Sequence, residues 1–465
     1  MTLIASISGI RGTIGGRPGQ GLTPFDIIRF TSAFATWALH RSQASGKRPA
    51  VVVGRDARIS GEMVESLVCH TLCAMGLDVY RAGLATTPTV EVAVPLKGAI
   101  AGIIVTASHN PAGWNALKLL NRDGEFISAG EGNEVLLLAG QDVFDFAGAD
   151  SLGRIIEEDF LQEHIRRILA HPLVDAAAIR QKAYRVVVDP VNSVGSIAIP
   201  ALLRSLGVTD IRVINGEPDG RFAHNPEPLP EHLGELAAEV PRSKAHLGIS
   251  VDPDVDRLAF VSEDGSFFGE EYTLVAVADY ILSRERGPVV SNLSSSRALS
   301  VVAARHNCEA FAAPVGEVNV VAEMKIREAV IGGEGNGGVI VPSLHYGRDA
   351  LAGVALFLSH LARTGLKMTE LRKKYPDFFM SKRKMELPRH VKVPLLLDYL
   401  AEKFREYPQN TSDGLKIDFP DQWFHLRKSN TEPVIRIYSE SSSAEGAERL
   451  AGLIESEIRT FVNNC

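Results

Sequence analysis

The chain has 465 residues and a formal net charge of −7, and its 45% hydrophobic and 23% charged residues are typical of a globular protein. This length exceeds what one hydrophobic core covers, so we expect three or four domains. The acidic balance argues against a nucleic-acid partner, yet it permits a local basic site for a small anion. No apolar run approaches the ~20 residues that span a bilayer, and residues 1–6 lack a cationic leader, so we expect a cytoplasmic protein without a membrane partner.

The N-terminal stretch places Arg11 between Gly9 and Gly12. This pattern predicts a tight loop that aims a guanidinium, with an ordinary turn as the alternative. A helix is then expected to begin after Thr23, because Thr23 can cap it, proline fits its first turn and Asp26 completes a capping box.

Three stretches of the chain repeat one plan of strand, polar loop, helix and strand. Their first strands are expected at residues 50–53, 185–188 and 288–290. This order is typical of parallel βαβ units and predicts three α/β domains of similar topology. The C-terminal part differs, because it has strands followed by an amphipathic helix at residues 443–462.

Changes in composition indicate breaks near residues 147–153, before an amphipathic helix at 157–170, near residue 256, and between residues 375 and 388. We therefore predict an α/β fold of three similar mixed α/β domains with βαβ units and a smaller C-terminal α+β domain around a central cleft. The predicted domain ranges are 1–150, 151–256, 257–375 and 376–465.

Cysteine is sparse, with four residues in the chain, which suits a reducing cytosol. Cys69 and Cys73 are four residues apart, so one helical face could carry both. Two thiols without a second pair do not make a zinc site, and we expect buried structural cysteines.

A polar turn, Thr106-Ala-Ser108-His109-Asn-Pro111, follows the buried strand expected at residues 101–105. The turn displays a hydroxyl, from Ser108, beside the imidazole of His109. On local evidence a surface loop rich in turn formers explains the pattern equally well.

Three carboxylates at alternate positions, Asp252, Asp254 and Asp256, follow the strand expected at residues 247–251. Their mutual repulsion would raise their pKa values unless a cation lies between them. Hard oxygen ligands in a loop at a strand end suit Mg²⁺, often shared with a phosphate. The glycine and glutamate that an EF-hand requires are missing.

A glycine-rich loop at residues 332–338 carries Glu334 and Asn336. No Gly-Lys-Ser/Thr follows, so the loop is a poor nucleotide-binding phosphate loop. Glu334 and Asn336 could instead bind vicinal sugar hydroxyls, because glycine permits close backbone approach.

A fourth polar loop begins at Arg427 and precedes the strand expected at residues 434–438. Its guanidinium, hydroxyls and amide make a good phosphate clamp. Arg436, in the following strand, could reach the same loop, and a capped turn with a solvated arginine is the alternative. The clamp residues are Arg427, Ser429, Asn430, Thr431 and Arg436.

These four motifs come in order, one per predicted domain. Together they predict an enzyme that handles a phosphorylated sugar in a cleft where four domains meet. The chain resembles the α-D-phosphohexomutase family of phosphoglucomutases, phosphomannomutases and phosphoglucosamine mutases. The similar segments, which span most of the chain, are residues 8–12, 106–111, 218–220, 225–228, 252–257, 334–338 and 427–433.

The resemblance implies that Ser108 carries a phosphoryl group and that Mg²⁺ is held by Ser108 and the three aspartates. The phosphoryl group would pass to a hydroxyl of a hexose phosphate and give a hexose 1,6-bisphosphate, which also serves as activator. Lys118 would act as general acid or base, Arg11 and His109 would assist at the phosphoserine, and Arg257 would bind substrate. The enzyme would be a monomer or homodimer.

Three departures from the family pattern stand out. Pro253 and Ala116 each replace a glycine, and Gly338 replaces a histidine that many relatives place after the sugar loop. General resemblance favours glucosamine phosphate over glucose or mannose phosphate as the substrate. A hydrolase that uses the same serine, and a non-catalytic sugar-phosphate binder, are the remaining alternatives.

Overall fold

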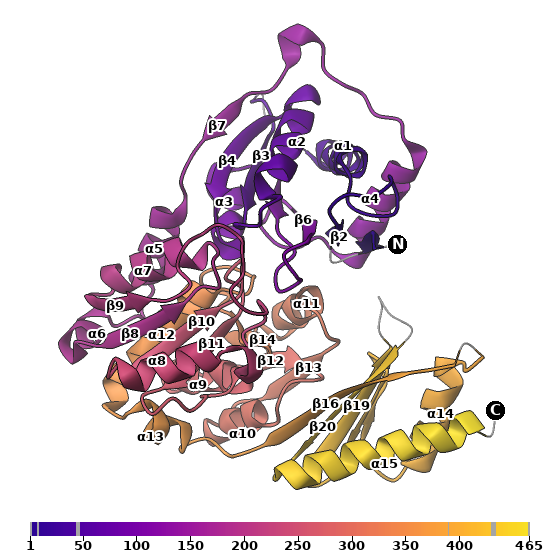
Figure 1. Ribbon diagram of the computed structural model, residues 1–465. Coiled ribbons are helices and arrows are strands. Elements are labelled where there is room, and N and C mark those ends of the chain that lie inside the picture. Colours follow the sequence, from indigo (N-terminus) through magenta and orange to yellow (C-terminus); the bar gives the residue numbers. More distant parts are fainter. Residues whose placement is uncertain (1, 7–8, 43–46, 389, 429–433, 464–465) are drawn as a thin grey trace.

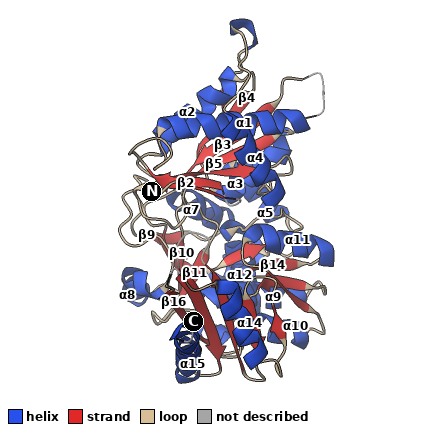
Figure 2. Ribbon diagram, turned by 90° about the vertical axis from the view of Figure 1, so that its right-hand side faces the viewer, coloured by secondary structure: helices blue, strands red, loops and turns tan. Residues whose placement is uncertain are grey.

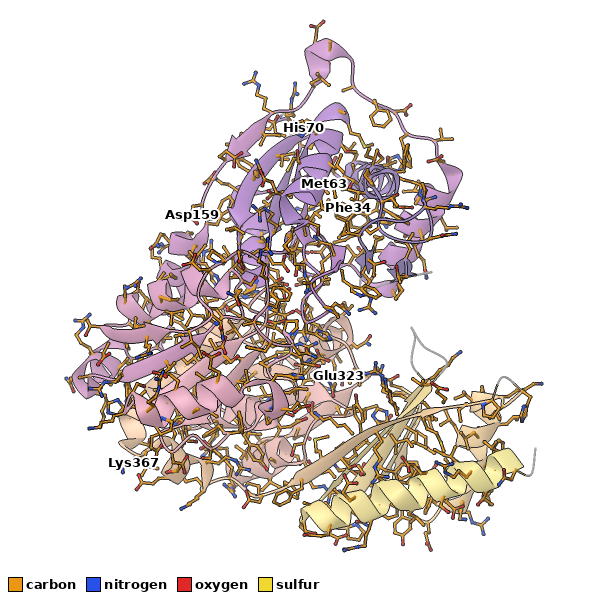
Figure 3. All side chains as sticks on the ribbon, in the orientation of Figure 1. Phe34, Met63, His70, Asp159, Glu323 and Lys367 are labelled. Carbon is orange, nitrogen blue, oxygen red and sulfur yellow. The ribbon has the colours of Figure 1, made fainter. Side chains whose placement is uncertain are left out.

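The structure is a computed structural model that describes residues 2–6, 9–42, 47–388, 390–428 and 434–463. In Figure 1 the first domain lies at the top, the second and third lie below it, and the C-terminal domain stands to one side. Phe34 lies within the first domain, whereas Lys367 lies at the opposite end of the molecule (Figure 3). Residues from all four parts line one central cleft.

The first domain is built on a seven-stranded mixed sheet. Its strands are β1 (Ile4–Ser6), β2 (Gly9–Thr13), β3 (Ala50–Arg55), β4 (Asp78–Leu84), β5 (Ala101–Val105), β6 (Trp114–Leu120) and β7 (Ile155–Glu157). Its helices are α1 (Pro24–Arg41), α2 (Gly61–Ala74), α3 (Thr87–Lys97) and α4 (Ala129–Gln141). The strand order is β1-β2-β6-β5-β3-β4-β7.

Both faces of this sheet are covered by helices, as Figure 2 shows. Val51 and Val53 of β3 pack into the core under α1, α2 and α4, whereas Val52 packs into the core under α3. A strand buried on both faces reads as a continuous apolar run rather than an alternating one. The valine runs therefore predicted the central strands.

The predicted loop at Arg11 is wrong, because Arg11 lies in β2 and pairs with Ala116 of β6. Gly9 enters the strand with φ 107°, and an added Cβ there would lie 2.5 Å from the carbonyl oxygen of Leu117. The strand fixes the direction of the Arg11 side chain more firmly than a loop would.

The helix predicted from Glu157 begins instead at Leu161, because Ile155–Glu157 forms β7 and pairs with β4. The capping box of α1 at Thr23 and Asp26 is confirmed. On α2, Cys69 is buried and Cys73 is half-buried, and both are free thiols.

The second and third domains each carry a four-stranded sheet, in the orders β11-β10-β8-β9 and β13-β12-β14-β15. The second-domain elements are α5 (Leu161–Ala170), α6 (Ala176–Lys182), β8 (Arg185–Asp189), α7 (Gly195–Ser205), β9 (Asp210–Val213), α8 (Gly234–Arg242), β10 (Leu247–Val251) and β11 (Leu258–Ser262). The third-domain elements are α9 (Glu270–Leu282), β12 (Val289–Asn292), α10 (Ala298–Arg305), β13 (Ala310–Ala313), α11 (Glu317–Arg327), β14 (Ile331–Glu334), β15 (Gly338–Ile340), α12 (Ala350–Thr364) and α13 (Met368–Arg372).

One hydrophobic core joins the second and third domains. Helix α12 lies within it, with buried residues on every side from Ala350 to Ala362. A helix that is apolar all round needs neighbours on all sides, and α5, α6, α7 and α9 supply them. The loops at the ends of these two sheets are therefore held in fixed positions.

The C-terminal domain has a five-stranded antiparallel sheet in the order β16-β20-β19-β18-β17. Its elements are β16 (Phe379–Glu386), α14 (Val393–Lys403), β17 (Gln409–Asn410), β18 (Leu415–Asp418), β19 (Gln422–Lys428), β20 (Val434–Ser441) and α15 (Ala444–Asn463). The predicted fold class is thus confirmed, with three similar mixed α/β domains and a smaller C-terminal domain. The exact domain ranges stay a prediction.

Among the described helices, none combines the length and the hydropathy that a membrane crossing requires.

Candidate active site

The four parts enclose a cleft of about 600 Å³. Of the described residues that line it, eight are basic and five are carboxylates, although the whole chain carries a net charge of −7. This local excess of cations suits an anionic small molecule. The basic residues are Arg11, Lys118, Arg257, Arg348, Lys382, Arg427, Lys428 and Arg436.

Ser108 lies in the turn after β5, with φ 48° and only 6% of its surface exposed. A non-glycine residue in the left-handed region is strained and is frequent at functional sites. The fully buried Arg58 holds the turn, because its guanidinium donates to the carbonyl oxygens of Ser108, Asn110 (2.6 Å) and Pro111 (2.7 Å). Sequence reasoning placed Arg58 only in a polar loop and gave it no role.

The Ser108 hydroxyl donates to Asp252 Oδ2 at 2.7 Å, and His109 Nδ1 lies 3.3 Å from Ser108 Oγ. Burial, reinforced by Arg257, lowers the pKa of His109 well below its ordinary value. The imidazole is therefore neutral at pH 7 and can accept a hydrogen bond or a proton.

The metal loop, residues 252–257, joins β10 to β11. Val255 has φ 63°, an uncommon value for a β-branched residue. This turn lets Asp252 Oδ1 accept from the backbone N–H groups of Asp256 and Arg257, each at 3.1 Å. All three aspartates are fully buried, so the loop gathers three carboxylates away from water.

Two protein cations compensate part of this charge. Asp256 Oδ2 accepts from Arg348 at 2.7 Å and from Lys118 at 3.4 Å. Burial would raise the pKa of Asp256, but Arg348 and Lys118 outweigh it and lower the pKa. The pKa of Asp252, by contrast, is raised well above its ordinary value by burial and by Asp256 and Asp254.

The aspartate triad fits a divalent cation. One carboxylate oxygen from each of Asp252, Asp254 and Asp256 lies within 4.8 Å of the others. Within the described part of the chain, Asp254 Oδ1 and Asp256 Oδ1 are buried and have no hydrogen-bond partner. Hard oxygens left free in this way are the ligands that Mg²⁺ prefers.

Lys118 lies in β6, and its Nζ donates to Asp254 Oδ2 at 2.6 Å. Burial would lower its pKa, but Asp254 and Asp256 outweigh burial and raise it above the ordinary value. Thr87 of α3 donates to the same oxygen of Asp254 at 2.6 Å. The first domain thus holds the metal loop of the second through two hydrogen bonds to a single carboxylate.

The sugar loop, residues 334–338, faces the cleft from the third domain. Glu334 Oε1 accepts from Asn292 Nδ2 at 2.8 Å and from the Gly316 N–H at 3.1 Å. Asn336 also lines the cleft, and its Oδ1 accepts from the Gly338 N–H at 3.2 Å. Both side chains are fixed by these hydrogen bonds and line the cleft.

The phosphate clamp of the C-terminal domain includes Arg427 and Arg436, which face each other on β19 and β20. Arg427 Nε forms an ion pair with Asp413 Oδ2 at 3.1 Å. Burial and the nearby Arg436 lower the pKa of Arg11, so the first and C-terminal domains bring positive charges together. Ser429, Asn430 and Thr431 lie outside the described residues.

Arg257, the last residue of the metal loop, donates to Glu227 Oε1 at 2.8 Å, and both residues line the cleft. The structure thus brings Arg11, Ser108, His109, Lys118, Arg257, Glu334, Asn336, Arg427 and Arg436 to one cleft. The aspartates lie beneath it, in contact with Ser108 and Lys118.

Sequence reasoning missed Arg348, Glu317 and Asn292, which also line the cleft. None belongs to a motif, and Arg348 precedes Asp349, the residue that caps α12. A charged residue beside a helix cap is ordinary, so position alone did not mark Arg348. The sequence signal that could have drawn attention to Arg348 was Gly338, a glycine at the position where many relatives have a histidine.

Comparisons with known proteins agree with this architecture. Models of the phosphoglucomutase/phosphomannomutase family match as alpha/beta/alpha domain I at residues 4–138, domain II at 162–265, domain III at 269–378 and the C-terminal domain at 374–456. A solved structure of a putative phosphomannomutase from Thermus thermophilus superposes with a TM-score of 0.81 at 25% identity, with both chains covered completely.

Curated relatives point to the same chemistry. A phosphoglucomutase/phosphomannomutase from Thermococcus kodakarensis is 36% identical over 94% of this chain and 95% of the relative. A phosphoglucosamine/phosphogalactosamine mutase from Sulfurisphaera tokodaii is 32% identical over 98% of both. With four matching domains in order and a polar cleft between them, the chain belongs to the phosphoglucomutase/phosphomannomutase family and is a phosphohexomutase, an isomerase that transfers phosphate intramolecularly.

Proposed function

We propose that the enzyme interconverts a hexose 1-phosphate and a hexose 6-phosphate through a phosphorylated Ser108 and a hexose 1,6-bisphosphate. The observation that carries this proposal is the 2.7 Å hydrogen bond between Ser108 Oγ and Asp252 Oδ2. It places a nucleophilic hydroxyl directly against a buried acidic triad that fits Mg²⁺.

In the forward half-reaction, a substrate hydroxyl attacks the phosphorus of phosphoserine 108, the bond from phosphorus to Ser108 Oγ breaks, and Ser108 Oγ takes up a proton as it leaves. The hydroxyl proton must pass to a nearby base, for which Lys118 and His109 are the candidates. His109 suits the base role, because its Nδ1 lies 3.3 Å from Ser108 Oγ and burial lowers its pKa and keeps the imidazole neutral, whereas Lys118 forms ion pairs with two aspartates. Bound Mg²⁺ supplies a positive charge that offsets the charge on the transferring group.

The return half-reaction transfers the other phosphate of the bisphosphate to Ser108. The substrate must therefore present either end to Ser108 while the opposite phosphate is held by Arg427 and Arg436. A clamp made of guanidinium groups suits this task, because it recognises a phosphate by charge and geometry whichever carbon carries it. Glu334 and Asn336 would contact the sugar hydroxyls between the two ends.

Among sugars we propose glucosamine phosphate as the preferred substrate. Several relatives over 30% identical carry the name "probable phosphoglucosamine mutase", including one from Methanopyrus kandleri at 34% identity over 95% of both chains. Glucose and mannose phosphates are the alternative substrates.

A coupled assay with Mg²⁺ and hexose 1,6-bisphosphate tests the proposal. Each 1-phosphate is supplied in turn, and 6-phosphate formation is measured together with the release of inorganic phosphate. Ser108→Ala should abolish turnover and remove the mass of one phosphate from the intact protein. Wild-type turnover in this variant would contradict the mechanism, and phosphate release without isomer would indicate the hydrolase instead.

A further inference from the structure

Arg348 lies between β15 and α12 at the back of the cleft, and only 8% of its surface is exposed. The adjacent Asp349 anchors this position, because its Oδ1 accepts from the N–H groups of Leu351 and Ala352 at the start of α12. Asp349 Oδ2 also lies 2.9 Å from His164 Nε2 in the second domain. The backbone at Arg348 is therefore fixed by contacts that do not involve its own side chain.

The guanidinium of Arg348 contacts three carboxylates from three separate segments. Nη2 donates to Asp256 Oδ2 of the metal loop at 2.7 Å, and Nη1 donates to Glu334 Oε2 of the sugar loop at 2.7 Å. Nε forms an ion pair with Glu317 Oε2, in the first turn of α11, at 3.0 Å. The planar guanidinium of Arg348 thus connects the metal loop to the sugar loop.

Gly338 is the residue that makes room for this side chain. A Cβ added at Gly338 would lie 2.3 Å from Arg348 Cδ and 3.0 Å from Arg348 Cγ. Gly338 does not have a positive φ, so its backbone would accept any L-residue. The absence of a side chain at 338 is therefore explained by the space that Arg348 occupies, and not by backbone conformation.

On the basis of the proposed mutase function, we propose that Arg348 is a positioning residue whose side chain fills the space left by Gly338, at the position where many relatives have a histidine. It holds Asp256 and Glu334 at a fixed separation, so the metal loop and the sugar loop present the same geometry to both orientations of the substrate. An arginine stays protonated at neutral pH, so Arg348 does not move the proton.

A double-mutant cycle tests this inference through Arg348→Met and Gly338→Ala. Arg348→Met keeps most of the side-chain length but removes the fork, and should lower kcat by about 100-fold with a much smaller change in KM. Gly338→Ala should lower kcat and Tm because its Cβ displaces Arg348. In the Arg348→Met/Gly338→Ala double variant the added methyl meets a flexible chain, so its effect on both quantities should be small.

Two matched variants complete the design. Arg348→Lys keeps the charge but not the two-pronged geometry, and should fall between wild type and Arg348→Met. Gly113→Ala adds a methyl where no heavy atom lies within 4 Å, so it controls for the loss of a glycine. If Arg348→Met is too unstable to purify, Gly338→Ala alone still displaces the guanidinium and carries the test.

A readout that does not depend on isomer formation separates this inference from the proposed function. The rate at which glucose 1,6-bisphosphate phosphorylates Ser108, followed by intact mass, reports one transfer step and should fall in Arg348→Met as kcat does. Wild-type protein that is phosphorylated but forms no isomer would contradict the proposed function only. Equal phosphorylation rates in wild type and Arg348→Met, or additive effects in the cycle, would overturn the role of Arg348.

Discussion

The metal loop and the phosphate clamp both bring charged side chains to one cleft, but they differ in the contacts that hold those side chains. Asp254 accepts from Lys118 and Thr87 of the first domain, and Asp256 accepts from Arg348 of the third, so the acidic side is fixed by all three α/β domains. Within the described part of the chain, which leaves out residues 429–433, Arg427 forms one ion pair and Arg436 Nη1 lies 3.5 Å from the Tyr438 hydroxyl.

This difference matches the tasks of the two regions. A metal-binding loop would have to keep its oxygens in one arrangement during phosphoryl transfer, and Lys118 and Arg348 already hold these aspartates in place. A phosphate clamp would have to accept phosphates at two different positions on a sugar, and guanidinium groups suit this because they recognise a phosphate by charge and geometry. We therefore expect damage to the metal loop to lower kcat, and damage to the clamp to raise KM.

The largest effect on activity is expected for Asp254→Asn. The amide keeps the shape of the side chain but removes the charge that Lys118 and the metal require, so kcat should fall by about 1,000-fold with little change in KM. Steady-state kinetics over a range of Mg²⁺ concentrations measures this, and a chelator should inactivate the wild type reversibly.

Asp264→Asn is the control for Asp254→Asn, because Asp264 is an exposed aspartate near the same sheet, and it should behave as wild type. A rise in KM without loss of kcat in Asp254→Asn would mean that the triad binds substrate rather than supporting transfer.

A smaller effect is expected at the clamp. Arg436→Met should raise KM by roughly 10- to 100-fold for the 1-phosphate and the 6-phosphate alike, because each loses one charge-assisted contact. Its kcat should change less than that of Asp254→Asn. Kinetics in both directions measures the effect.

Lys384→Met is the control for Arg436→Met, since Lys384 pairs with Arg436 across the sheet and is exposed, but does not line the cleft. An effect on only one of the two substrates would show that the clamp is tied to a single orientation of the sugar.

Sequence reasoning placed candidate residues correctly where a motif is contained in a continuous segment. Strands 101–105 and 247–251 have their predicted bounds, and each ends directly in a loop of the candidate site. Because the loops follow buried strands, Ser108 and Asp252 could be expected to face the same space. Their hydrogen bond, between residues 144 positions apart, is the point where these local predictions meet.

The contacts that sequence reasoning missed depend on assembly of distant segments. Arg11 was expected in a loop because nothing nearby in sequence shows that Gly9–Thr13 pairs with β6. The helix expected from Glu157 starts later because β4 recruits Ile155–Glu157 into the first sheet. Arg348 joins loops from two domains, and no local pattern encodes such a junction.

Behind the metal loop, a buried ionic cluster offers the last and smallest test. His345 Nδ1 lies 3.3 Å from Glu91 Oε2, and its Nε2 lies 3.2 Å from Asp349 Oδ2. Burial would lower the pKa of His345, but Asp349 and Glu91 outweigh burial and raise the pKa to about 10. Burial raises the pKa of Glu91 to about 8. This cluster joins the first and third domains next to Arg348. Among the described residues, the phosphate clamp is not backed by a comparable buried ionic cluster.

Both shifts give stability the same pH dependence. A raised histidine pKa stabilises the fold fully below about 6.5 and loses this contribution as pH rises to about 10. A raised glutamate pKa stabilises the fold below about 4.5 and loses this contribution as pH rises through about 8.

The double variant His345→Gln/Glu91→Gln should therefore have a lower Tm than wild type near pH 6, by several degrees, and the difference should shrink toward pH 9.5. His40→Gln, at an exposed position on α1, should follow the wild-type profile. If Tm changes with pH in the same way in wild type and the double variant, the charges of the cluster do not contribute to stability. The rigidity of the metal loop would then come from packing alone.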